Sequence, residues 1–192
     1  MKKLLAIAVL AAASVAAAAE EKPFVAFVNV GGAVKADLFA SCATNFVPGV
    51  MPARIRTFGT EEVDVASIMN PATPDRRFGE NAKLHVYFVS DKTFPPQLTA
   101  PGMWAVINVR NLDKEADAEK FKTRIEKMML KGLAFACGFG ANQDIGRCVM
   151  GAGSFSTLRG IDGTSASYSP FVAFPLMDFL SARNLIEEPT FE

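Results

Sequence analysis

Histidine is almost absent from this 192-residue chain, and that scarcity excludes more than any other feature of its composition. The single histidine is His85, so no zinc site with three histidine ligands can be assembled. Cysteine is also scarce, with three residues, which allows one disulfide at most. The 20 basic and 20 acidic residues cancel, and this balance gives no electrostatic reason to expect a nucleic acid or an anionic membrane as partner.

The N-terminus has the pattern of a secretory signal peptide. Lys2 and Lys3 form its positive region, and residues 4–15 form an apolar region too short to span a membrane. Ala17 and Ala19 then supply the small residues that signal peptidase recognises.

We therefore expect residues 1–19 to be a signal peptide and residues 20–192 to be one secreted or periplasmic domain. Loss of the two leader lysines leaves 18 basic and 20 acidic residues, a net charge of −2. No later segment has the unbroken apolar length of a membrane span.

The three cysteines in an oxidising compartment predict one possible bridge and one free thiol. We favour Cys137–Cys148, because these residues flank a glycine-containing loop that a bridge would tether to the end of a helix. Pairing of either residue with Cys42 remains open.

Apolar and alternating runs predict the strands of a sheet. Between the first two runs, residues 34–46 have helical spacing and stop at Pro48-Gly49, which predicts a strand–helix–strand unit with parallel strands. The four predicted strands are residues 24–30, 53–58, 83–90 and 103–109.

The other segments complete one α/β domain with a mixed, mostly parallel sheet and a less regular C-terminal part. A long central helix is predicted from about Asp113 toward Gly138. The remaining predictions are a weak helix at 61–69, a surface loop at 70–81, a short loop at 97–100, a helix at 170–180 and an exposed tail at 187–192.

The long helix has the outline of a zinc-peptidase helix. It becomes almost wholly apolar, breaks at Gly138 and is followed by the short turn Cys148-Val149-Met150. Zinc peptidases place two histidines four residues apart on one helix face, with a glutamate beside the first, and in metzincins a glycine then turns the chain toward a third histidine. The order of elements in this chain resembles the archaemetzincin-like, metzincin-type metallopeptidase fold.

The resemblance implies where the zinc motif would lie. Gly138 matches the turn glycine and Met150 matches the methionine of the Met-turn. Lys131, Phe135 and Ala141 stand at the three ligand positions, and Gly132 stands at the position of the general base. All three ligands and the base are absent, so the resemblance implies a pseudo-peptidase with no catalytic residues and no cofactor.

Two functions follow as hypotheses. The first is a secreted, non-catalytic metzincin-like domain that binds a protein, a peptide or a glycan. The alternative is a small secreted hydrolase of another class, in which His85 acts as a base with a cysteine or an aspartate. His85 lies in the predicted strand 83–90, where a lone histidine is more often a packed residue than a ligand.

Overall fold

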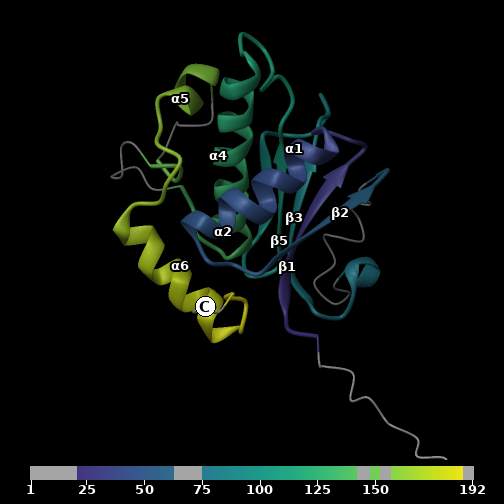
Figure 1. Cartoon of the computed structure of the whole chain (residues 1–192), viewed down its shortest axis with the longest axis vertical. Helices are drawn as coiled ribbons and strands as arrows, with labels where there is room; N and C mark the ends of the chain where they lie inside the picture. The colour runs from purple at the N-terminus through teal and green to yellow at the C-terminus, as the bar shows by residue number, and fades with distance from the viewer. Residues whose placement is uncertain (1–20, 63–74, 142–147, 152–156, 188–192) are drawn as a thin grey trace, which may run out of the picture.

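A five-stranded sheet forms the middle layer of the molecule (Figure 1). The computed structural model describes residues 21–62, 75–141, 148–151 and 157–187. The strand order is β2-β1-β3-β5-β4, with β4 antiparallel to β5 and the other pairs parallel. The strands are β1 (Phe24–Val30), β2 (Ile55–Thr60), β3 (Ala82–Val89), β4 (Gln97–Ala100) and β5 (Trp104–Asn108).

Helices of very different lengths accompany the sheet. The long helix α4 crosses one face, and α6 lies to one side of it (Figure 1). None of the helices in the described ranges is long and apolar enough to cross a membrane. The helices are α1 (Ala36–Ser41), the π-turn η1 (Cys42–Phe46), α2 (Val47–Val50), the 3₁₀ turn η2 (Arg76–Phe78), α4 (Ala118–Ala136), α5 (Leu158–Asp162) and α6 (Pro170–Ala182).

The predicted strand–helix–strand unit is present. Val25 of β1 pairs with Ile55 of β2 in a parallel ladder, and the helical segment between them packs on the α4 side of the sheet. The helix runs past the predicted stop, because a π-turn carries it into α2 with Pro48 in the first turn. A proline is tolerated there since its missing N–H has no helical partner to lose.

The core has two parts, one on each face of the sheet. Leu84, Val86 and Phe88 of β3 belong to the larger part, which α4 covers. Tyr87 and Val89, which alternate with them, belong to the smaller part on the opposite face. The mixed α/β fold predicted from the sequence is confirmed.

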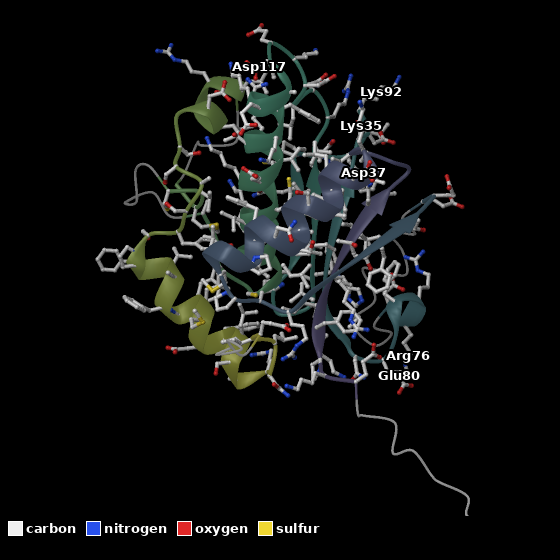
Figure 2. All side chains as sticks on the ribbon, in the orientation of Figure 1. Lys35, Asp37, Arg76, Glu80, Lys92 and Asp117 are labelled. Atoms are coloured by element: carbon white, nitrogen blue, oxygen red, sulfur yellow. The ribbon has the colours of Figure 1, made fainter. Side chains whose placement is uncertain are left out.

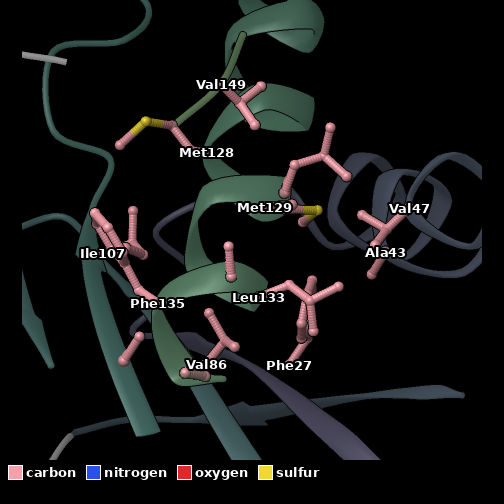
Figure 3. Packing of buried hydrophobic residues seen from close by; sticks show 14 of the residues in the cluster. Phe27, Ala43, Val47, Val86, Ile107, Met128, Met129, Leu133, Phe135 and Val149 are labelled. Atoms are coloured by element: carbon pink, nitrogen blue, oxygen red, sulfur yellow. The ribbon is translucent and has the colours of Figure 1, made fainter. Parts of the chain in front are cut away.

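Helix α4 is the centre of the larger core. Every residue from Arg124 to Ala136 is buried, and Figure 3 shows Met129 and Leu133 of α4 between the strand residues Phe27 and Val86 and the helical residue Ala43. The buried segment includes four charged residues, Arg124, Glu126, Lys127 and Lys131, alongside its apolar side chains.

Residues 97–100 form strand β4 and not a loop, since they pair with β5 from Gln97↔Ile107 to Ala100↔Trp104. Prolines on both sides made a short loop the natural interpretation, but the alternation of polar and apolar residues is that of a strand. The predicted helix at 61–69 lies largely outside the described residues.

Candidate functional site

Helix α4 begins and ends at defined caps. The Asp117 carboxylate accepts a hydrogen bond from the Lys120 backbone N–H at 2.8 Å. At the other end, Gly138 and Phe139 donate backbone hydrogen bonds to Phe135 and Ala134. Gly138 has φ 96°, so this is a Schellman-type end that glycine adopts without strain.

Gly138 also fixes α4 against the β4–β5 turn. A Cβ added at this glycine would lie 3.3 Å from Cβ of Pro101, and Gly102 donates a hydrogen bond of 2.9 Å to the Ala136 carbonyl. The end of α4 is thereby held beside the end of β4.

Lys131 and Phe135 lie one turn apart on α4, and both are 4 % exposed. The Lys131 Nζ is 5.2 Å from the centroid of the Phe135 ring, a cation–π distance. Burial lowers the pKa of Lys131 to about 7, and the nearby Cys148 thiol acts in the opposite direction. The first two ligand positions of the predicted zinc motif are therefore occupied by a lysine and a phenylalanine that pack against each other.

The turn Cys148-Val149-Met150 is buried in the same core as Phe135. The Val149 N–H donates to the Ser167 carbonyl at 3.1 Å, which ties the turn to the segment before α6. Tyr168 in that segment donates its hydroxyl hydrogen bond to the Leu130 carbonyl of α4. Cys148 of this turn lies near Lys131 of α4.

Gly132 faces the sheet and leaves no room for a side chain. An added Cβ would lie 2.5 Å from Cγ1 of Val86 and 3.1 Å from Cγ1 of Ile107. Carbon atoms do not approach this closely without a shift of the backbone. The predicted position of the general base is therefore closed by packing.

Ala141 is exposed and follows the Gly138 turn, immediately before the undescribed residues 142–147. Of the predicted motif, Lys131 and Phe135 are in contact, and Cys148 of the turn lies near Lys131.

Zinc does not fit the residues at these positions. A lysine, a phenylalanine and a glycine supply none of the imidazole, thiolate or carboxylate donors that zinc takes. Cys148 is one sulfur donor beside them, and among the described residues no group of three or more His, Cys, Asp or Glu is arranged to hold a metal ion.

The predicted disulfide is not present in the structure. Cys42, Cys137 and Cys148 are all buried, and no bridge joins any two of them. Burial raises the pKa of both Cys42 and Cys137 to about 12, which keeps these thiols protonated at neutral pH. All three thiols belong to the larger apolar core, where a reduced cysteine packs as a small hydrophobic residue.

His85 lies on the opposite face of the sheet from the cysteines. Its ring stacks on Tyr87 with centroids 6.0 Å apart and lies 5.9 Å from Phe78, and both partners belong to the smaller core. Because the cysteines belong to the larger core, the predicted Cys–His pair is not formed. His85 is 5 % exposed, and burial lowers its pKa.

The acid nearest His85 is Asp75, which the sequence did not single out. Its carboxylate accepts hydrogen bonds from Arg77 at 2.6 and 2.9 Å and from the Tyr87 hydroxyl at 2.6 Å. Burial alone would raise the pKa of Asp75, but these hydrogen bonds lower it to about 2. A carboxylate so engaged is an anchor for η2 and a poor base.

Strand β4 presents an open edge beside α4. The Pro96 and Ala100 carbonyls accept hydrogen bonds from Asn108 and Met103, so alternate residues of β4 face β5. The backbone groups of Gln97 and Thr99 then face outward, and within the described ranges they have no hydrogen-bond partner. A free strand edge of this kind can take an extended peptide.

A cavity of about 300 Å³ opens at the beginning of this edge, lined in part by Gln97. Helix α5 supplies one wall, and a bidentate ion pair between Arg124 and Asp162 (2.7 Å for each bond) holds α5 against α4. The side chain of Arg124 is 1 % exposed, so this pair is rigidly placed.

Comparison with known proteins identifies the fold. No protein-family model and no curated protein sequence matches the chain. Among solved structures, it is similar to the 1.5 Å crystal structure of archaemetzincin from Methanopyrus kandleri, with a TM-score of 0.62 and 17 % sequence identity. The similarity covers 83 % of this chain and 96 % of the other. The chain therefore has an archaemetzincin-like fold, as its element order predicted.

Proposed function

We propose that this chain is a non-catalytic, metzincin-like domain that binds an extended peptide and acts outside the cytoplasm. One pair of observations carries the proposal: Lys131 and Phe135 pack against each other within α4, and α4 also contacts β4, the edge strand of the sheet. The first feature argues against zinc chemistry, and the second supplies a place for a peptide backbone.

The surroundings of Lys131 argue against a bound metal ion. An environment that lowers the pKa of a lysine to about 7 disfavours one positive charge, and it disfavours a divalent cation more strongly. A glutamate in place of Gly132, the residue next to Lys131, would also clash with Val86 and Ile107. These contacts support the proposal that the domain works without a zinc motif.

The edge of β4 supports peptide binding. Its outward N–H and C=O groups would add a strand to the sheet, and backbone hydrogen bonds supply much of the affinity in such complexes. Gln97 and Thr99 are exposed while Leu98 packs against the smaller core, so the strand is anchored on one face and open on the other.

Metal content and peptidase activity test the non-catalytic part. We expect the purified mature domain to hold much less than one zinc per chain by elemental mass spectrometry. We also expect no chelator-sensitive cleavage of a random peptide library. Stoichiometric zinc or chelator-sensitive cleavage would refute this part of the proposal.

Substitution of Thr99 tests the peptide-binding part. Thr99→Pro removes an outward N–H without removing a bond to β5, and proline is tolerated at strand edges. Against an octapeptide selected from a bead library, we expect a loss of about tenfold in affinity, the value of one or two backbone hydrogen bonds. Thr99→Val keeps the N–H and is the matched control. Equal binding by both variants, with unchanged near-UV circular dichroism, would exclude β4 as the site.

Export tests the proposed location. Produced with its own N-terminus in a Gram-negative host, the protein should appear in the periplasmic fraction with an intact mass that begins at Glu20. Cytoplasmic full-length protein would contradict a cleaved signal peptide.

A further inference from the structure

The cavity beside β4 has an apolar floor. Leu112 of the β5–α4 connection, Met128 of α4 and Ile161 of α5 line it, and each is at most 5 % exposed. The carbon atoms of these three residues suit the aliphatic part of a side chain. The cavity volume of about 300 Å³ exceeds that of any one amino-acid side chain, so a peptide side chain can enter with room for water.

The wall of this cavity is preorganised. The Asn108 amide, at the end of β5, donates hydrogen bonds to the carbonyls of Asp91 (2.6 Å) and Phe94 (3.0 Å). Its amide oxygen accepts the Arg110 backbone N–H at 3.1 Å. One side chain therefore ties residues 91–94 to the end of the sheet, and a wall that is already ordered loses little entropy when a ligand binds.

The rim carries two cations and one anion. Lys92 and Arg110 are exposed, and their side chains form no hydrogen bond or ion pair with any residue in the described ranges. Asp91 is the anion, and one of its carboxylate oxygens already accepts hydrogen bonds from the N–H (2.6 Å) and hydroxyl (2.7 Å) of Thr93. The rim thus has an excess of positive charge in groups that are still available.

From this arrangement we infer that the cavity binds a carboxylate-bearing side chain of the peptide, with glutamate as the best match. The aliphatic stem of glutamate would cover the apolar floor, and its carboxylate would meet Lys92 and Arg110 at the rim. Gln97 belongs both to the cavity and to the outward edge of β4, so a peptide backbone on that edge passes the cavity mouth. This inference rests on the proposed peptide-binding function and adds the chemical class of the ligand.

Matched peptides test the inference. A bead library of octapeptides supplies a binder, which is then made with Glu, Gln or Lys at each position in turn. At one position we expect Glu to bind about fivefold more tightly than Gln, as one or two exposed ion pairs allow, and Lys to bind more weakly than Gln. The preference should shrink as salt concentration rises.

Variants of the rim assign the preference to the cavity. The double variant Lys92→Gln with Arg110→Gln should bind the Glu and Gln peptides equally, and Asp91→Asn should increase the preference for Glu. Arg76→Gln is the control, because Arg76 is an exposed cation at the opposite end of the molecule from Lys92 (Figure 2). In methyl NMR spectra, the Met128 signal should shift with the Glu peptide and less with the Gln peptide.

The outcomes separate the two proposals. Peptides that bind without a preference for Glu, or that prefer Lys, overturn the acidic ligand and leave peptide binding intact. A preference for Glu that survives the double variant also overturns the inference. If no peptide binds to the folded domain, both the acidic ligand and the proposed function fail.

Discussion

Lys131 lies on the α4 face of the sheet and His85 on the opposite face, and each is about 95 % buried. Burial lowers the pKa of both residues, but their neighbours differ. The Cys148 thiol is the group that opposes the shift of Lys131, whereas Asp75 opposes the shift of His85. The surroundings of Lys131 disfavour its charge, while the surroundings of His85 contain a carboxylate that accepts hydrogen bonds.

This difference shows two ways in which a buried ionisable residue is accommodated. On the α4 face, Lys131 packs its ammonium over the Phe135 ring. On the opposite face, Asp75 joins Arg77 and Tyr87 and thereby anchors η2 to β3. Neither arrangement contains the set of convergent donors that a metal ion requires.

The largest expected effect comes from restoring the general base on the α4 face. Gly132→Glu would force a carboxylate against Val86 and Ile107, at a cost on the order of 4 kcal/mol or more from overpacking and buried charge. We expect little folded protein by circular dichroism. Gly132→Ala should lose about 1–3 kcal/mol in urea unfolding.

Gly140→Ala is the matched control for this prediction. Among the described residues, apart from its two chain neighbours, no atom lies within 4 Å of the Cβ that would be added at Gly140, so the free energy of unfolding should change by less than about 0.5 kcal/mol. A stable Gly132→Glu protein would show that α4 is not packed as closely against the sheet as the structure indicates.

The next largest expected effect is the pH dependence of the free energy of unfolding that Lys131 creates. Its pKa is about 7 in the folded state, against 10.5 for an unperturbed lysine, so between these values the unfolded chain binds the extra proton. Stability therefore rises with pH in this window, by at most about 1.4 kcal/mol per unit. Lys131→Met should remove the rise, measured as the difference in unfolding free energy between wild type and variant from pH 7 to pH 9.

Above pH 9, Cys42 and Cys137 have the opposite effect on the free energy of unfolding, so the comparison stops at that pH. Their pKa values are raised from 9 to about 12 by burial, so stability is lost as the pH rises beyond 9. A difference between wild type and Lys131→Met that does not change from pH 7 to pH 9 would contradict a neutral Lys131.

On the opposite face, the Asp75–Tyr87 hydrogen bond should have a moderate effect. Tyr87→Phe removes the 2.6 Å bond and leaves the Asp75 carboxylate with Arg77, which we expect to cost about 1–2 kcal/mol. A double-mutant cycle with Asp75→Asn isolates the coupling between the two residues. A coupling energy near zero would mean that Tyr87 contributes through packing alone.

The smallest expected effect is the acid sensitivity contributed by His85. Because burial lowers its folded pKa below 6.5, the unfolded state binds more protons in acid, and stability falls as the pH drops through 6.5. His85→Gln should make this loss of stability in acid smaller. The loss is limited in the wild type because the Asp75 carboxylate raises the pKa of His85 and so opposes the effect of burial. An unchanged slope between pH 6.5 and pH 5 would show that His85 is not held neutral by the fold.

Much of the fold follows from local patterns. The apolar run at Phe24–Val30 became β1 with the predicted bounds, and the last turn of α4 ends at the glycine that was expected to stop it. Strand β4 was missed because four residues between prolines carry too weak a pattern, although the Pro101-Gly102 turn before the next strand is a hairpin signal.

The candidate site was only partly predictable. Lys131 and Phe135 lie on one side of α4, since residues four apart in a helix share a face. The spacing could not show that Asp75 lies near His85, because these residues meet only when η2 folds onto β3. The bridge between Cys137 and Cys148 was expected from their separation along the chain, which says nothing about how each thiol packs.

By itself the sequence determined the order of the elements other than the short strand β4, the long central helix with its glycine end, and the scarcity of histidine and cysteine as metal donors. These are properties of local hydrophobic periodicity and of composition. Tertiary structure alone decided that Gly132 touches Val86, that Lys131 is buried against Phe135 and Cys148, and that β4 has a free edge beside a cavity. Those contacts join segments far apart in the chain, so they depend on how the layers pack and not on any local pattern.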